Sequence, residues 1–155
     1  MRAWTAGSEL LAARDGILPR MTERITRLNP DQLHPTPGYH HVTVVAAGRL
    51  AFLAGQCPLD RAGVLVGAGD LAAQLDQIAR NAVTALTAVG ARPADVVRSV
   101  IYVVSSDTEV LTAAWRRLND SALGPAFTSA STLLGVSQLG FAGQLVEVDL
   151  TAALP

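Results

Sequence analysis

The apolar and polar positions of the chain follow two different periods, and these predict where strands and helices lie. Segments with a period of two, or with a run of β-branched residues, predict strands over residues 24–28, 41–47, 50–54, 96–104, 131–138 and 144–152. Helical spacing predicts helices over residues 70–89 and 108–119. Because strands and helices do not alternate strictly, the pattern predicts an α+β fold in which both helices cover one face of a mixed sheet.

The residue types at the ends of the predicted helices support their boundaries. Asp70 and Asp107 are expected N-caps, because a short acidic side chain accepts hydrogen bonds from the first free backbone N–H groups of a helix. Gly90 is the expected capping glycine after the first helix. Between the second and third strands, Gly48-Arg49 predicts a hairpin turn, since glycine supplies a positive φ.

The length and composition of the chain fit a single domain. It has 155 residues, of which 50% are apolar and 16% are charged, as is typical of a folded globular domain. We expect residues 1–22 to form a poorly ordered N-terminal extension and residues 23–155 to form the domain. No apolar run reaches the about 18 residues that a membrane span needs, and residues 1–20 lack the pattern of a signal peptide. The sequence therefore predicts a cytoplasmic protein with no membrane partner.

Charge and residue usage exclude several kinds of chemistry. All 12 basic residues are arginines, and without a lysine the chain has no Schiff-base nucleophile, pyridoxal phosphate anchor or P-loop lysine. A formal net charge of −1 leaves no positive excess for a nucleic acid. Cys57, the single cysteine, has no disulfide partner in the chain. His40 and His41 are expected on opposite faces of a strand, so we predict neither a metal site nor a cofactor.

Five short segments give the chain a family resemblance when they are taken together and in order. They are Pro37-Gly38-Tyr39, Leu53 to Asp60 followed by Gly63, Ala73-Gln74 through Gln77 to Asn81, Val89-Gly90 with Asp95-Val96-Val97, and Leu145 to Val148. Over about 120 residues this order and spacing resembles the RidA family, also called YjgF. The resemblance implies a chorismate-mutase-like α+β fold. It also implies a homotrimer whose intersubunit clefts hydrolyse small imines or enamines to keto acids and ammonia.

The resemblance also assigns roles to individual residues. Glu147 matches the carboxylate that orients water, and a carboxylate in an apolar strand is expected to be paired, solvated or used. Tyr39 matches a cleft tyrosine that orients substrate. Gly55 and Gln56 match the segment that lines the cleft, and Cys57 accompanies them as an inert thiol. The structural alternatives remain open: Tyr39 as a half-buried residue at a strand entrance, Glu147 as a solvent-facing residue, and Gly55 as a bulge glycine.

The chain departs from the family pattern where relatives carry a carboxylate-binding arginine. Ser131 stands at that position, and one neutral hydroxyl replaces a charged bidentate donor. Thr112 stands in place of a family asparagine. The resemblance places these two residues, together with Trp115 and Leu133, among those that contact substrate. We therefore expect a less charged cleft and a less anionic substrate than in the relatives. The substitute cations considered are His41, Arg49 and Arg98.

Three functions follow from these observations. The first is a deaminase-type hydrolase with an altered substrate range, in which Glu147 and Tyr39 are catalytic. The second is a non-catalytic protein that binds a small ligand in the same fold. The third, a ribonuclease or translation inhibitor, is disfavoured by the 5% aromatic content and by the absence of lysine.

Overall fold

The computed structural model describes residues 23–46 and 48–155, and the predicted extension over residues 1–22 lies outside this range. The helices and strands follow one another in the predicted order. They are β1 (Ile25–Leu28), β2 (Val42–Val45), β3 (Leu50–Gln56), α1 (Leu71–Ala88), β4 (Val96–Val104), α2 (Thr108–Asn119), β5 (Ala130–Val136) and β6 (Val146–Ala153). Two short 3₁₀ helices, η1 (Pro93–Asp95) and η2 (Gly124–Thr128), join β4 and β5 to the elements that precede them.

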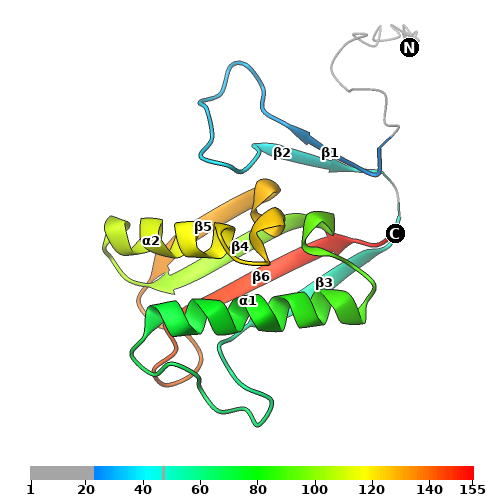
Figure 1. The fold of residues 1–155 in the computed structure, drawn as a ribbon. Coiled ribbons are helices and arrows are strands. Elements are labelled where there is room, and N and C mark those ends of the chain that lie inside the picture. Colours follow the sequence, from blue (N-terminus) through cyan, green and yellow to red (C-terminus); the bar gives the residue numbers. More distant parts are fainter. Residues whose placement is uncertain (1–22, 47) are drawn as a thin grey trace, which may run out of the picture.

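Four strands form the main sheet, in the order β3-β6-β4-β5. β5 runs parallel to β4, whereas β6 runs antiparallel to both β3 and β4. The sheet is therefore mixed, and α1 and α2 lie side by side over the same face of it (Figure 1). The predicted α+β architecture with two helices on one face is confirmed.

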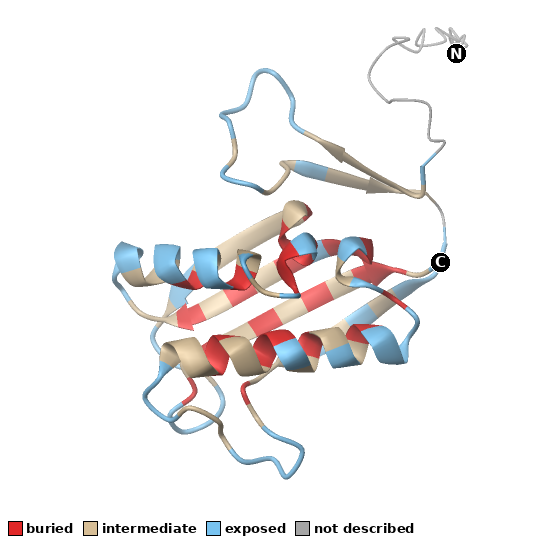
Figure 2. Cartoon of the chain, in the orientation of Figure 1, coloured by how far each residue is buried: buried red, intermediate tan, exposed pale blue. Residues whose placement is uncertain are grey.

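The hydrophobic core lies between this sheet and the two helices. Side chains along β4 and β6 alternate between the two faces, so buried residues follow every second position (Figure 2). Ile101 and Val148 pair in register, and both are fully buried beneath the helices. Ile78 and Leu86 of α1 and Phe127 of η2 fill the space above them. Within residues 23–46 and 48–155, no helix covers the opposite face of the sheet (Figure 1).

The helix ends form as the sequence predicts. The Asp70 carboxylate accepts a hydrogen bond from the Ala73 N–H at 3.1 Å, and Asp107 accepts one from the Glu109 N–H at 2.8 Å. Gly90 follows the end of α1 with a φ of +74°, a conformation that glycine adopts at little cost. These local contacts define where both helices begin and where α1 ends.

The predicted hairpin between the second and third strands is wrong. β2 pairs with β1, in the register Ile25↔Val45, and the two strands form a separate sheet. β3 pairs instead with β6. A two-residue hairpin turn requires a positive φ, and Gly48 is not among the glycines that have one. Apolar alternation identified both strands correctly but carried no information about their partners.

The β1–β2 ribbon lies across the end of the main sheet where β4 and β5 begin (Figure 1). Arg24 forms an ion pair with the buried Asp95 of η1, and Arg27 donates a hydrogen bond to the Ala94 carbonyl at 2.9 Å. The Ala130 N–H donates to the Thr43 hydroxyl at 3.0 Å. Because a two-stranded ribbon is only marginally stable alone, these polar contacts determine where it rests.

Candidate functional site

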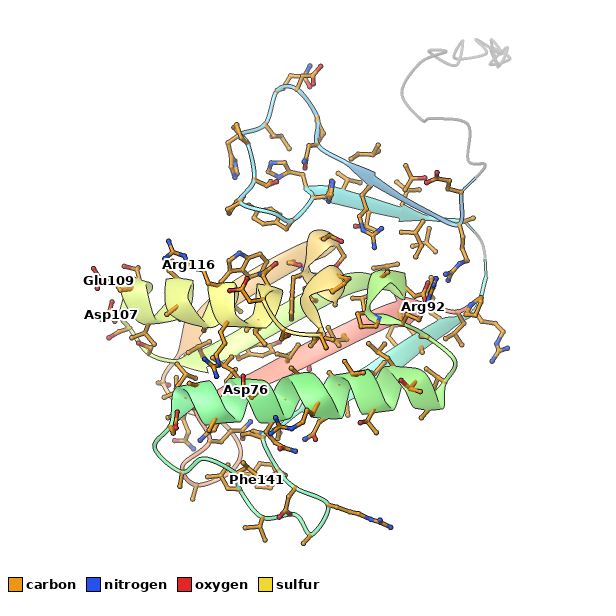
Figure 3. The ribbon with its side chains drawn as sticks, in the orientation of Figure 1. Asp76, Arg92, Asp107, Glu109, Arg116 and Phe141 are labelled. Atoms are coloured by element: carbon orange, nitrogen blue, oxygen red, sulfur yellow. The ribbon has the colours of Figure 1, made fainter. Side chains whose placement is uncertain are left out.

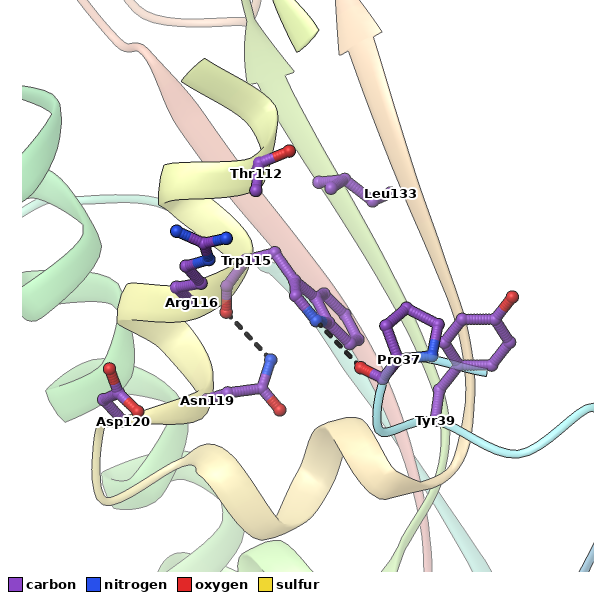
Figure 4. A pocket seen from close by; sticks show the side chains of 8 residues that line it. All are labelled: Pro37, Tyr39, Thr112, Trp115, Arg116, Asn119, Asp120 and Leu133. Atoms are coloured by element: carbon purple, nitrogen blue, oxygen red, sulfur yellow. Dashed lines mark hydrogen bonds between the residues drawn. The ribbon is translucent and has the colours of Figure 1, made fainter. Parts of the chain in front are cut away.

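A pocket of about 610 Å³ opens between α2, the loop before β2 and Leu133 on the helix side of β5. Four of the predicted site residues line it, namely Tyr39, Thr112, Trp115 and Leu133 (Figure 4). The other lining residues are Pro37, Arg116, Asn119 and Asp120. A volume of this size suits a small organic molecule.

Aromatic contacts hold the pocket in shape. The Trp115 indole N–H donates a hydrogen bond to the Pro37 carbonyl at 3.3 Å, which fastens α2 to the loop (Figure 4). The Tyr39 ring meets the Trp115 ring edge-on, with centroids 6.3 Å apart. On its other side Trp115 packs against the buried Phe127 at 5.8 Å. Trp115 of α2 therefore contacts both the core, through Phe127, and the loop, through Pro37 and Tyr39.

Three polar residues at the pocket were missed by sequence reasoning: Arg116, Asn119 and Asp120. Asn119 uses its amide to donate to the Trp115 carbonyl at 2.8 Å. The missed signal was helical spacing, because residues three and four positions apart share a helix face. Thr112, one of the predicted site residues, lies one turn before Arg116 on that face.

The Glu147 carboxylate lies in a second group of residues, on the helix-free face of the sheet. Its Oε2 atom accepts a hydrogen bond from the buried Gln144 amide at 3.0 Å. Gly55 lies so close that a Cβ atom there would overlap Glu147 Oε1 and lie 2.8 Å from the carboxyl carbon. The register of β3 shifts between Leu53 and Gln56, so Gly55 is also a bulge residue. Gly55 therefore both leaves space for the Glu147 carboxylate and forms the bulge in β3.

Cys57 and Gln56 lie beside this group without adding a nucleophile. The Cys57 thiol is 3.6 Å from Glu147 Oε2. Burial, followed by the charge of Glu147, raises the pKa of Cys57 to about 11, so the thiol stays protonated at neutral pH. Gln56 turns its amide back to the Ala54 carbonyl at 2.9 Å.

Ser131 lies outside both groups. Its hydroxyl is 2.6 Å from the Ser99 hydroxyl, and it lies 3.2 Å from the Phe127 carbonyl, to which it can donate. Ser99 is fully buried, so the serine pair acts as a polar link between β4 and β5. The Ser131 hydroxyl is not among the groups that line the pocket.

The three cations considered as substitutes for the missing arginine do not line the pocket either. His41 packs edge-on against His34, with ring centroids 4.7 Å apart, and its Nε2 lies 2.9 Å from the His34 carbonyl. Arg98 donates to the backbone carbonyls of Ser99 and Ala130. Arg49 lines a different pocket, near the C-terminus. Arg116 is the arginine that the structure brings to the pocket.

The two groups lie on opposite faces of the main sheet in one copy of the chain. Leu133 pairs with Ile101, which faces the helices, whereas Glu147 pairs with Tyr102, the next residue along β4. Successive strand residues point to opposite faces. The pocket and the Glu147 group therefore cannot meet within a single copy.

Two further observations bear on the chemistry of the described residues. In residues 23–46 and 48–155, no cluster of three or more His, Cys, Asp or Glu side chains has the arrangement of a metal site. Neither helix in this part of the chain combines the length and the apolar character that a bilayer span requires.

Comparison with known proteins places the chain in a family. The family model described as Endoribonuclease L-PSP matches residues 30–154. The crystal structure of YyfB from Yersinia pestis, described as a protein of unknown function of the conserved Rid family, matches with a TM-score of 0.76. The two sequences are 32% identical, over 85% of this chain and all of that one. The chain belongs to the Rid (RidA/YjgF) family.

Other relatives of this Rid-family chain extend the likeness without naming an activity. Protein DfrA of Myxococcus xanthus is 31% identical over 116 residues, which cover 74% of this chain and 83% of DfrA. A second Rid protein of Yersinia pestis, YyfA, has a TM-score of 0.60 at 20% identity, over 77% of this chain and 90% of YyfA. At that identity the likeness shows the fold alone.

Proposed function

We propose that this Rid-family chain is a deaminase-type hydrolase that adds water to the C=N bond of small imines, including the imines that form when enamines tautomerise. The arrangement of Glu147 is the observation that carries the proposal. Its Oε2 atom is held by Gln144, whereas its Oε1 atom accepts no hydrogen bond from the described residues and faces the glycine at position 55. A fixed carboxylate with one free oxygen can accept a proton from an attacking water.

The proposed reaction consumes one water and releases one ammonia. Glu147 accepts a proton as the water oxygen bonds to the imine carbon, and the carbon–nitrogen double bond becomes single. The carboxyl group then returns the proton to nitrogen. The hydroxyl proton of the resulting carbinolamine then moves to nitrogen, the carbon–nitrogen bond breaks, and a carbonyl compound and ammonia leave. The Tyr39 phenol, 3.3 Å from His34 Nε2, is proposed to orient the substrate.

The active form is proposed to be a cytoplasmic homotrimer in which each site joins the pocket of one copy to the Glu147 group of the next. Support comes from the separation of the two groups within one copy and from the apolar residues of the helix-free face. Phe52 of β3 is 77% exposed there, and the exposed residues Leu50 of the same strand and Leu134 of β5, at the other edge of the sheet, lie on the same face. The outer edges of β3 and β5 also pair with no described strand, and such edges favour association.

Ammonia release from freshly generated imines tests this proposal. The wild-type chain should release ammonia faster than buffer, and Glu147→Gln should lower the rate by about 100-fold or more, as loss of a general base does. Because Gln keeps the size of Glu and can still pair with Gln144, the assembly should be unchanged. Equal rates in the two proteins would overturn the proposal.

The alternative of a non-catalytic binding protein predicts a different result in the same experiment. The pocket would then bind carbonyl compounds while neither protein released ammonia above the buffer rate. It is favoured by the position of Ser131, whose hydroxyl is used between strands and not offered to a ligand. RNA cleavage, which the name of the family model suggests, receives no support from a chain with a net charge of −1.

A further inference from the structure

We propose that Arg116 of α2 binds the carboxylate of the substrate, and that the substrate carries an apolar side chain of branched-chain or aromatic size. The inference deepens the proposed function and rests on it for the identity of the reaction. The binding of a carboxylate can be tested without the reaction. The 2-oxo acid that imine hydrolysis would form has the same carboxylate and side chain, so it should occupy the same pocket. The charge missing from the position of Ser131 is thereby supplied from a helix instead of a strand.

Arg116 has a guanidinium group that is free to bind an anion. Within the described part of the chain no carboxylate oxygen lies within 4.0 Å of it. The neighbouring Arg117 behaves differently, because it forms two hydrogen bonds of 2.7 and 2.8 Å with Asp76 of α1. Arg116 projects from α2 on the side turned away from α1 (Figure 3). Arg117 therefore links α2 to α1, whereas Arg116 is available to bind an anion.

The apolar part of the pocket determines the kind of side chain that fits. Trp115, Leu133 and Pro37 form one side of it, and the Trp115 ring lies between the Arg116 side chain and the Tyr39 ring (Figure 4). A substrate with only a methyl group would leave most of the about 610 Å³ unfilled. Apolar contact favours a larger group by burying more of its surface. The pocket thus has an apolar side next to the positively charged Arg116.

Asp120 carries the opposite charge to Arg116 at the pocket. Its removal should therefore change carboxylate binding in the opposite direction to the removal of Arg116, which gives a second test. Asp120 lies one helical turn after Arg116 and also lines the pocket, so its negative charge weakens the attraction for any anion bound there. Thr112 adds no charge, and its hydroxyl hydrogen is already donated to the Thr108 carbonyl at 2.8 Å. Removing the charge at 120 should therefore tighten the binding of a carboxylate.

Binding of 4-methyl-2-oxopentanoate, measured by titration calorimetry on the full chain, tests the inference. Wild type should bind it at least about 10-fold more tightly than pyruvate, because of the larger apolar group. Arg116→Gln should weaken binding about 10- to 100-fold, as loss of a charge-assisted pair does. Asp120→Asn should strengthen it. Arg80→Gln, which removes an exposed arginine of α1 outside this pocket, should leave it unchanged.

Several results would overturn the inference. If circular dichroism shows that both proteins are folded, equal affinities of wild type and Arg116→Gln for 4-methyl-2-oxopentanoate would show that Arg116 does not bind the carboxylate. Equal weakening by Arg80→Gln would show a general charge effect, and equal affinity for pyruvate would remove the size preference. Binding that follows the prediction without ammonia release would contradict the proposed reaction alone, so the two failures can be told apart.

Discussion

Gly55 and Glu147 show how one missing side chain can set the position of a charged one. The carboxylate occupies the space that a Cβ atom at position 55 would take. Gln144 donates a hydrogen bond of 3.0 Å to the other oxygen. The position of the carboxylate therefore depends on a glycine for steric reasons, and Gly55 does not have a positive φ that would itself favour glycine.

Gly55→Ala should displace the Glu147 carboxylate and lower imine hydrolysis. A methyl group at this position overlaps Oε1, and we expect a rate loss of about 10- to 100-fold from misplacement of a catalytic group. Gly140→Ala is the matched control, since nothing lies within 4 Å of a Cβ atom built there. The measurement is ammonia release, and equal rates for the two variants would contradict this account of Gly55.

Cys57 should behave as an inert thiol. Its pKa is raised from 9.0 to about 11 by burial and by the charge of Glu147, so at neutral pH its thiolate fraction is about 100-fold lower than that of an ordinary cysteine. Alkylation by iodoacetamide should therefore keep accelerating up to about pH 11. Cys57→Ser should retain hydrolysis. A rate plateau near pH 9 would show that the thiol is not perturbed.

At the scale of the elements, local signals predicted the strands and helices, whereas long-range pairing was not predictable. Asp70 and Gly90 mark the ends of α1 because capping involves only neighbouring residues. The pairing of β2 with β1 depends on which edges are free once β3 pairs with β6. For the site, residue types indicated Glu147 through the family resemblance. Helical spacing from Thr112 could have indicated Arg116, but which face of α2 meets the loop at Pro37 depends on the tertiary fold.

The β1–β2 ribbon should depend on Asp95, and the dependence should vary with pH. Burial alone would raise the pKa of Asp95, but the Arg92 backbone N–H and the guanidinium groups of Arg24 and Arg92 outweigh it and hold the pKa below its usual value. Asp95→Asn should lower the free energy of unfolding at pH 7 by about 1–3 kcal/mol, because it removes charge-assisted hydrogen bonds from a buried carboxylate.

The sign of this pH effect follows from the lowered pKa. A carboxyl group with a depressed pKa stabilises the fold above the unfolded-state pKa of about 3.9 and loses that contribution as the pH falls through the folded-state value. The difference between wild type and Asp95→Asn should therefore shrink below about pH 4 in urea unfolding. Asp31→Asn, at an exposed site in the loop between β1 and β2, is the control. A difference that stays constant with pH would contradict the account.

At the scale of the whole molecule, the proposed self-association would cover the apolar residues of the helix-free face and the outer edges of β3 and β5, which pair with no described strand. Light scattering should give a mass three times the 16.2 kDa of one chain. Phe52→Glu should reduce that mass, because a charge is costly on an apolar surface buried between copies. Thr84→Glu, at an exposed position of α1 on the other side of the sheet, should leave it unchanged. A wild-type mass of 16.2 kDa would contradict the trimer.

Mixed assemblies of two inactive variants test most directly whether each site is shared between copies. Glu147→Gln keeps the pocket intact, and Tyr39→Ala keeps the Glu147 group intact. When the two are coexpressed in equal amounts, about one interface in four should join an intact pocket to an intact carboxylate. The account predicts that ammonia release recovers to about a quarter of the wild-type rate. No recovery above the rates of the separate variants would contradict it.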